Sequence, residues 1–195
     1  MIVPYFYLFM LQLMENIHQL DIAILEFINV HRIQELDGLF ILVTDSAWVI
    51  SYFVPALLIL YALISRNYTD LYKALTILIS VILSFFLVSL LKHYIDRPRP
   101  FAMYGFIQKV SDGGSPSFPS GHSSDAFAFV TALCIIYSRK ILLLTYIWAF
   151  LLAYSRMHLG VHYPSDVIAG VILGICSAII CCQTYKALVR RRKTS

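Results

Sequence analysis

Apolar residues dominate the chain from residue 47 onward, and they gather in five runs separated by short polar stretches. A helix needs about 20 residues to cross the hydrocarbon layer of a membrane, and slightly shorter runs suffice when their ends lie among the headgroups. The pattern therefore predicts five membrane-spanning helices: Ala47–Ile64, Leu71–Leu91, Ser123–Tyr137, Ile141–Tyr154 and Val167–Cys182.

The first 30 residues carry two different patterns. Residues 2–14 are apolar but short for a span, so they predict a short or tilted membrane helix or a segment in the interface; no small-residue cleavage site of a signal peptide follows. In residues 17–30, Ile17, Leu20 and Ile24 recur at helical spacing, which is typical of an amphipathic helix at the membrane surface. We expect an all-α membrane bundle with five to six transmembrane helices.

Composition supports a membrane protein. The 195 residues are 59% hydrophobic and 13% charged, whereas soluble domains carry about 25% charged residues. We expect one membrane-embedded domain, with an N-terminal helical region (1–45), a core (46–182) and a basic tail (183–195). The four cysteines (Cys134, Cys176, Cys181, Cys182) lie in apolar runs without zinc-type spacing, which predicts small buried hydrophobic residues.

The net charge of +4 comes mostly from the tail, so it indicates membrane topology and no nucleic-acid partner. Alternation of the spans places Arg66, Arg139, Lys140 and the tail on one side, which the positive-inside rule makes cytoplasmic. The opposite, extracytoplasmic side then receives residues 92–122 and 155–166. Cations in these two segments run against the positive-inside rule and do not help to orient the protein in the membrane. Their presence there suggests a function.

Three short pieces of sequence on that side carry candidate chemistry. The first runs from Lys92 to Arg97-Pro98-Arg99-Pro100, where the prolines favour an extended chain. Alone, it also fits cations reaching from a helix end to the membrane surface. The second is Pro119-Ser120-Gly121-His122, which predicts a helix start whose N–H groups suit an anion. The glycine-rich residues 113–117 before it could form part of a lid.

The third piece is Ser155-Arg156, followed by His162, Pro164 and Asp166. Proline fits the first turn of a helix, so Asp166 would reach back to His162 and orient its ring. His158 and His93 are weaker candidates for the site. Asp125 is interpreted as an ordinary acid in the first turn of a helix. The acids lie singly (Asp96, Asp112, Asp125, Asp166) while cations converge, which favours a bound phosphate over a metal ion.

In order and spacing, the three pieces resemble the tripartite signature of the type-2 phosphatidic acid phosphatase superfamily: Lys-x6-Arg-Pro, Pro-Ser-Gly-His and Ser-Arg-x5-His-x3-Asp. The superfamily includes membrane lipid phosphatases, bacterial acid phosphatases and vanadium haloperoxidases. All signature positions are filled, and the resemblance covers roughly residues 45–182.

The resemblance implies a role for each residue and no cofactor. His162 would be the nucleophile that forms a phosphohistidine, Asp166 would orient it, and His122 would protonate the leaving oxygen and then activate water. The phosphate would be held by the remaining signature positions (Lys92, Arg99, Ser120, Gly121, Arg156). The family spacing selects Arg99, and not Arg97, as the phosphate-binding arginine. Arg97 would contact a second phosphate or the headgroup layer.

The expected partner is a phosphorylated lipid entering sideways from the bilayer; the sequence does not indicate an oligomeric state. We rank polyprenyl (undecaprenyl) diphosphate first, phosphatidylglycerophosphate second and lipid A third. Two alternatives stay open: a lipid phosphotransferase that uses the same site, and a transporter or channel that binds an anionic lipid and does not require His162. We expect a bell-shaped pH–rate profile from the two histidines, and full activity in EDTA.

Overall fold

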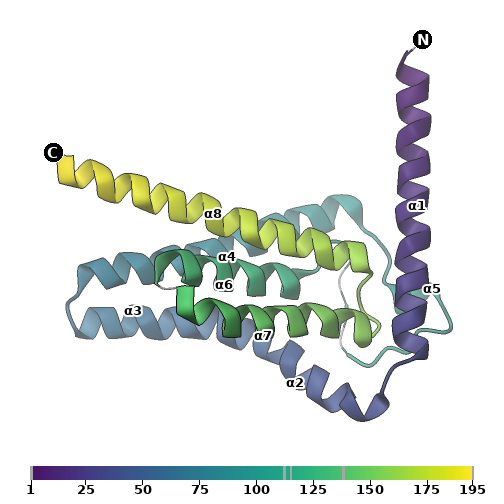
Figure 1. Ribbon diagram of the computed structural model, residues 1–195, viewed down its shortest axis with the longest axis horizontal. Helices are drawn as coiled ribbons and strands as arrows, with labels where there is room; N and C mark the ends of the chain where they lie inside the picture. Colours follow the sequence, from purple (N-terminus) through teal and green to yellow (C-terminus); the bar gives the residue numbers. More distant parts are fainter. Residues whose placement is uncertain (1, 112, 115, 138, 195) are drawn as a thin grey trace.

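The computed structural model describes residues 2–111, 113–114, 116–137 and 139–194, and it contains only helices and loops in this part of the chain (Figure 1). The all-α fold is therefore confirmed. The helices are α1 (Ile2–Val30), η1 (Gln34–Leu36), α2 (Asp37–Trp48), the π-helical turn η2 (Val49–Phe53), α3 (Val54–Ile64), α4 (Tyr68–Ile95), α5 (Pro100–Met103), α6 (Gly121–Ile136), α7 (Arg139–His158) and α8 (Pro164–Thr194).

The helices α3, α4, α6, α7 and α8 run along a common direction, whereas α1 crosses the end of this bundle (Figure 1). The short α5, the start of α6 and the turn between α7 and α8 all lie at the end that α1 crosses. The turn between α3 and α4 and the C-terminus lie at the opposite end. The segments 92–122 and 155–166 thus share one end, as the alternation of spans predicts.

Three helical segments in the described residues are long and apolar enough to cross a membrane: Gln34–Ile64, Tyr68–Met103 and Pro164–Arg191. The apolar α6 is shorter, with 16 residues. A total of five to six transmembrane helices stays a prediction. The last helix also continues through the predicted basic tail as far as Thr194.

The first predicted span, Ala47–Ile64, is part of a longer helical segment. This segment covers Gln34–Ile64 and is interrupted by the π-helical turn η2. Pro55 follows this turn and has no N–H to give to the preceding helix. A π-helical turn shifts the hydrogen-bond pattern at such a point without ending the helix. The segment bends there, so α2 slants across the bundle end (Figure 1).

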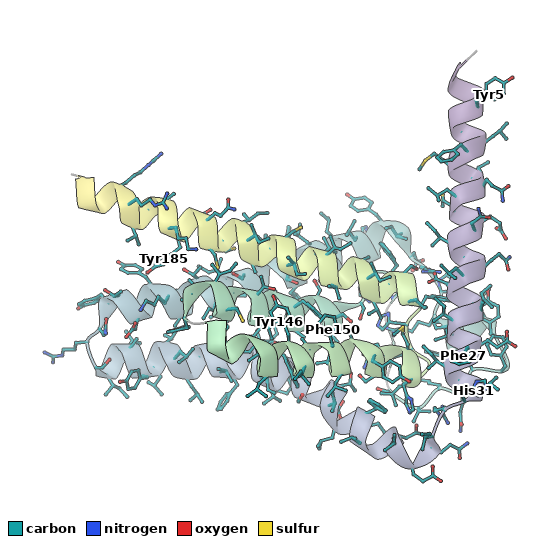
Figure 2. The ribbon with its side chains drawn as sticks, viewed as in Figure 1. Tyr5, Phe27, His31, Tyr146, Phe150 and Tyr185 are labelled. Atoms are coloured by element: carbon teal, nitrogen blue, oxygen red, sulfur yellow. The ribbon has the colours of Figure 1, made fainter. Side chains whose placement is uncertain are left out.

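The N-terminal pattern is also simpler in the structure than in the sequence. Residues 2–14 and 17–30 form the single helix α1, whose N-terminal part extends beyond the bundle, with Tyr5 near its free end (Figure 2). Its contacts with the bundle come from the second half, where Asp21 and Leu25 are buried.

The bundle core lies between α4, α6, α7 and α8. Ile77, Phe127 and Leu152 are among its fully buried side chains. The rings of Tyr146 and Phe150 on α7 meet Phe127 edge-on, at centroid distances of 5.9 and 5.2 Å (Figure 2).

Glycines let α8 approach α6 closely. A side chain at Gly170 would overlap the carbonyl oxygen of Ser120, and one at Gly174 would overlap that of Ser124. Small residues spaced four apart are a common means of close helix packing in membranes. This contact brings the start of α6 next to the start of α8.

The cysteine prediction is wrong for Cys176, which is exposed; Cys182 is buried, and Cys134 and Cys181 are half-buried. Cys176 lies on the outward face of α8, and a helix in a bilayer can turn an apolar thiol toward lipid at no cost.

Candidate active site

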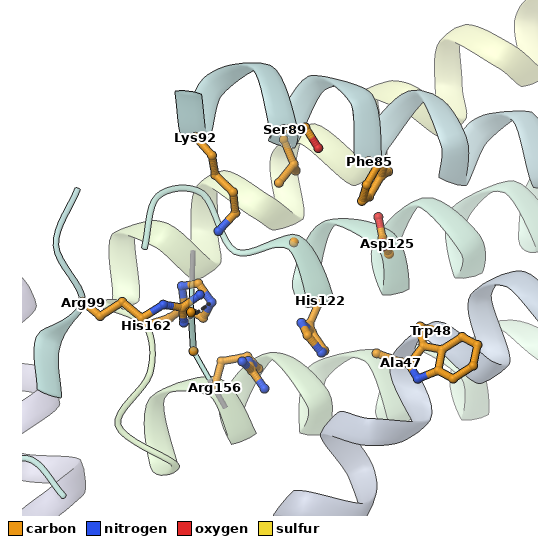
Figure 3. A pocket seen from close by; sticks show the side chains of 14 residues that line it. Ala47, Trp48, Phe85, Ser89, Lys92, Arg99, His122, Asp125, Arg156 and His162 are labelled. Carbon is orange, nitrogen blue, oxygen red and sulfur yellow. Dashed lines mark hydrogen bonds between the residues drawn. The ribbon is translucent and has the colours of Figure 1, made fainter. Parts of the chain in front are cut away.

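A cavity of about 460 Å³ lies at the bundle end that α1 crosses, and signature residues from all three pieces of sequence line it (Figure 3). The nitrogen-bearing ends of these side chains converge on a shared space. The signature residues in the lining are Lys92, Arg99, Gly121, His122, Arg156 and His162.

Each of these residues comes from a different structural position. Lys92 is in the last turn of α4, and Arg99 is in the extended link before α5. His122 is in the first turn of α6, Arg156 is in the last turn of α7, and His162 precedes α8. The bundle therefore joins residues that lie up to 70 positions apart.

His162 is 1% exposed, and its two ring nitrogens face different groups. The Nε2 atom lies 3.3 Å from Nη1 of Arg99, and Nδ1 lies 3.4 Å from Oδ2 of Asp166 without a well-aligned hydrogen bond. A guanidinium can only donate, so Nε2 is the acceptor and the proton of a neutral ring belongs on Nδ1, facing Asp166. This tautomer leaves the Nε2 lone pair as the reactive one.

Burial is the main cause that lowers the pKa of His162 to about 3; Asp166 opposes this shift, and the cationic Arg156 and Arg99 add to it. The ring is therefore neutral near neutral pH.

Asp166 is fully buried and anchored at both oxygens. Its Oδ2 accepts hydrogen bonds from the Tyr163 N–H (3.0 Å) and the Ser117 hydroxyl, and its Oδ1 accepts one from Arg97 Nη1 (2.6 Å). Its backbone carbonyl accepts from the Ser120 N–H at 2.9 Å, which ties the second piece of sequence to the third. The carboxylate is thus held in a fixed direction beside His162.

Arg156 is 2% exposed, yet in the described residues its guanidinium forms no ion pair and its Nε atom has no hydrogen-bond partner. Its Nη1 donates to the Thr44 hydroxyl of α2 at 2.5 Å. Asp45 attracts this buried cation only from beyond ion-pair distance, so much of the cost of burial remains, and an anion in the cavity would offset it. Sequence reasoning missed Thr44, because a threonine inside an apolar run gives no signal.

The start of α6 differs from the expectation. Ser120 is the N-cap residue, but its hydroxyl pairs with Ser123 Oγ at 2.9 Å and does not cap the helix. Ser120 is fully buried and is not in the cavity lining, whereas Gly121 is. The free N–H groups of this first turn are the part of α6 suited to an anion.

Arg97 does not line this cavity, and its guanidinium is engaged by two carboxylates; a contact with the headgroup layer stays a prediction. Arg97 bridges Asp166 to Asp21 of α1, with Nη2 2.8 Å from Asp21 Oδ2. Its guanidinium also stacks on Tyr163, 3.8 Å from the ring centre. The Arg-Pro-Arg-Pro pattern could not separate the two arginines, because the partner of Arg97 lies 76 residues away.

Asp125 is not an ordinary first-turn acid. It lines the cavity one turn beyond His122 and accepts a hydrogen bond from Tyr52 at 3.2 Å. Asp125, Phe85 and Trp48 lie further along the bundle than His122 (Figure 3). Its position three residues after His122 was the available signal, since residues at this spacing share one helix face.

The predicted lid is described in part, because Ser115 lies outside the described residues, as does Asp112. Gly113 and Gly114 line the cavity, and a side chain at Gly113 would come within 2.9 Å of Arg99. Pro116 accepts a hydrogen bond from Lys92 through its carbonyl oxygen. The loop thus lies against Lys92 and Arg99, the two cavity-lining cations of the first piece of sequence.

The other candidate histidines lie outside the cavity lining. His158 is buried and pairs with Asp37 of α2, Nε2 to Oδ1, at 2.9 Å. His93 packs edge-on against Tyr94. Among the residues described, no group of three or more His, Cys, Asp or Glu side chains could hold a metal ion.

Known proteins share this fold. The Aquifex aeolicus LpxE crystal structure matches with a TM-score of 0.70 and 30% identity, over 84% of this chain and 95% of that one. The crystal structure of a transmembrane PAP2 type phosphatidylglycerolphosphate phosphatase from Bacillus subtilis matches with a TM-score of 0.73 and 24% identity, over 93% and 94% of the two chains.

Relatives in sequence carry phosphatase names. A lipid A 1-phosphatase of Rhizobium etli is 37% identical over 102 residues, 49% of this chain and 43% of that protein. An undecaprenyl-diphosphatase of Sulfolobus acidocaldarius is 28% identical over 162 residues, 79% and 73% of the two chains. The chain spans less than half the length of the lipid A phosphatase relatives from Rhizobium and Bacteroides thetaiotaomicron.

A family model described as the PAP2 superfamily matches residues 73–190, which include all three signature pieces. With the match covering more than half of the chain, the protein belongs to the PAP2 superfamily.

Proposed function

We propose that this protein is an integral membrane phosphatase that removes a phosphate from a phosphorylated lipid through a phosphohistidine intermediate. The observation that carries the proposal is the cavity itself. It joins a neutral histidine whose Nε2 lone pair faces Arg99, a second histidine, and the buried Arg156, which has no carboxylate within ion-pair distance in the described chain.

In the first step, Nε2 of His162 attacks the phosphorus atom of the lipid phosphate. The N–P bond forms as the bond from phosphorus to the lipid oxygen breaks, and His122 gives a proton to that oxygen. The proton on Nδ1 stays beside Asp166, whose negative charge stabilises the ring as it becomes positive.

In the second step, water attacks the phosphohistidine. His122, now unprotonated, takes a proton from the water as the N–P bond breaks, so the enzyme returns to its starting state with inorganic phosphate released. One histidine thus acts as acid and then as base, which matches its place across the cavity from His162.

The cations supply charge stabilisation. Phosphoryl transfer depends mainly on positioning and on neutralising the phosphate oxygens. Lys92, Arg99 and Arg156 would contact these oxygens together with the N–H of Gly121. Ser120 would act indirectly, through Ser123 and the backbone of Asp166.

The favoured substrate is a polyprenyl diphosphate such as undecaprenyl diphosphate, with phosphatidylglycerophosphate and lipid A as alternatives. The apolar part of the cavity wall, formed by Trp48, Phe85 and Val88, suits the lipid portion next to the phosphate. The undecaprenyl-diphosphatase name of the Sulfolobus relative supports the first choice, and the lipid A 1-phosphatase name of the Rhizobium relative supports the third.

For topology, we propose that the cavity end of the bundle faces the extracytoplasmic side of the inner membrane and that α8 ends in the cytoplasm. The support is the charge pattern: Arg66 and the basic residues near the C-terminus lie at the end of the bundle opposite the cavity.

The test is phosphate release by the purified protein in detergent with EDTA, using the three lipids in turn. We expect release without added metal, loss of nearly all release in His162→Ala, and near wild-type release in His93→Ala, a matched histidine outside the cavity lining. Release that survives His162→Ala would contradict the assigned nucleophile, and a strict need for Mg²⁺ would contradict the metal-free site. Phosphate that appears only on an added acceptor lipid would indicate phosphotransfer instead of hydrolysis.

A further inference from the structure

We propose that α1 is part of the catalytic apparatus: Asp21 acts through Arg97 as a positioning residue for Asp166, and therefore for His162. This inference rests on the proposed function, in which His162 is the nucleophile. It assigns a role to two residues that are not signature positions, and one of them, Asp21, also lies outside the matched residues 73–190.

Asp21 is 2% exposed and makes contact with donors on two other segments. Its Oδ1 accepts from the Ser165 N–H at 2.8 Å, and its Oδ2 accepts from the Ser165 hydroxyl at 2.5 Å and from Arg97 Nη2 at 2.8 Å. Ser165 is in the first turn of α8, directly before Asp166. The carboxylate of α1 therefore holds both the start of α8 and the arginine beside it.

Arg97 passes this contact on to Asp166. One edge of its guanidinium faces Asp21, and Nη1 donates to Asp166 Oδ1 at 2.6 Å and to Ser165 Oγ at 2.8 Å. A planar guanidinium that binds two carboxylates at once fixes the direction of both. The stack on Tyr163 limits its rotation further.

The geometry at Asp166 explains why this matters for His162. The Oδ2 atom faces His162 Nδ1, and Oδ1 is held by Arg97. Without the bond at Oδ1, the carboxylate is held only through Oδ2, by the Tyr163 N–H and the Ser117 hydroxyl, and it can pivot about that oxygen. The 3.4 Å separation leaves little margin for such a pivot, because the carboxylate orients the ring and stabilises its positive charge only while it faces Nδ1–H.

A purely structural reading is that Asp21 and Arg97 only attach α1 to the bundle. The chain offers a control for this, because α1 has a second attachment: Asn29 Nδ2 donates to the Met157 carbonyl of α7 at 3.3 Å. Asn29→Ala loosens α1 without touching Arg97 or Asp166. The two readings therefore predict different results for Asp21 and Asn29.

The experiment compares wild type, Asp21→Asn, Arg97→Gln, the double variant and Asn29→Ala in detergent, measuring kcat, KM and thermal unfolding. We expect kcat to fall about ten- to hundred-fold in Asp21→Asn and Arg97→Gln with KM changed less than about two-fold, as for a misplaced catalytic group. The double variant should be no slower than Arg97→Gln alone, because both changes break one chain of contacts. Asn29→Ala should keep wild-type kcat.

A second readout separates positioning from loosening. Arg97→Gln removes a positive charge from beside Asp166, so the less compensated carboxylate favours the protonated His162. The acid limb of kcat/KM should therefore move to higher pH in Arg97→Gln. Loosening of α1 alone does not move that limb.

If Asp21→Asn shows no cooperative unfolding transition, Ser165→Ala takes its place, since it removes one donor to Asp21 and one acceptor of Arg97. Unchanged kcat in the folded variants, or an equal loss in Asn29→Ala, would overturn the inference. A different result would contradict the proposed function, namely phosphate release that survives His162→Ala.

Discussion

Two arginines at the bundle end, the half-buried Arg97 and the buried Arg156, have opposite surroundings. Arg97 is held between two carboxylates and an aromatic ring, whereas Arg156 has one hydroxyl partner and a buried Nε atom without one. A guanidinium held between two carboxylates fixes their directions, whereas one without a carboxylate neighbour is able to bind an incoming anion. This difference supports the proposal that Arg97 positions Asp166 and that Arg156 binds the phosphate.

The pKa of His162 leads to a prediction about pH. Because burial lowers this pKa to about 3, we expect kcat/KM not to fall between about pH 7 and pH 5. The ascending limb of the expected bell then lies below that window. A pH profile of kcat/KM checks this, and a limb near the ordinary histidine pKa of 6.5 would contradict it.

The same shift affects stability. The unfolded chain binds a proton at His162 near pH 6.5, and the folded chain does so only near pH 3. Between these values the unfolded state binds more protons, so this residue's contribution to stability is complete above pH 6.5 and declines as the pH falls toward 3.

For individual residues, the sequence predicted which side chains line the cavity. It predicted only some of the hydrogen-bond partners of these side chains. The signature spacing selected Arg99, His122, Arg156 and His162, and all four line the cavity. It could not reveal that Ser120 Oγ pairs with Ser123, because that depends on how the first turn of α6 is oriented.

At the scale of elements, the contact between α6 and α8 places the two histidines. Gly170 and Gly174 allow the backbones to touch, and the Ser120 N–H then reaches the Asp166 carbonyl at 2.9 Å. A bulkier residue at either position must push the helices apart.

We predict that Gly174→Ala destabilises the protein by about 1–3 kcal/mol, as overpacking commonly does, and lowers phosphate release. Gly38→Ala is the matched control, because a side chain at Gly38 meets nothing within 4 Å. Denaturation in detergent together with the phosphate assay checks both variants. A Gly174→Ala protein as stable and active as Gly38→Ala would mean that the close approach is not needed.

Hydrophobic periodicity predicted the bundle helices well, because α4, α6, α7 and α8 keep long apolar runs bounded by polar turns. It was less successful at the N-terminus, where the polar residues Glu15, Asn16, His18 and Gln19 divide the apolar pattern while the backbone of α1 continues without a break. Periodicity also gave no hint of Asp21, since a lone acid on an amphipathic helix normally faces water.

For the whole molecule, the arrangement follows from alternation of helices. Consecutive spans return the chain to the same end, so three pieces of sequence far apart in the chain meet at the cavity, and α1 closes that end from the side (Figure 1). The sequence could predict that these pieces come together, because loops alternate between the two ends of the bundle along the chain. It could not predict the crossing direction of α1, which depends on tertiary contacts of Asp21, Leu25 and Asn29.

The most direct test of the account is to trap the phosphoenzyme. The purified protein is mixed briefly with lipid carrying a radiolabelled phosphate, quenched in denaturant at alkaline pH, and analysed for label bound to protein. We predict an acid-labile, base-stable label on His162 in the wild type, a larger amount in His122→Ala with a substrate that has a good leaving group, and none in His162→Ala. Label that persists in His162→Ala, or phosphate release at full rate with no labelled protein at any time, would contradict the phosphohistidine mechanism.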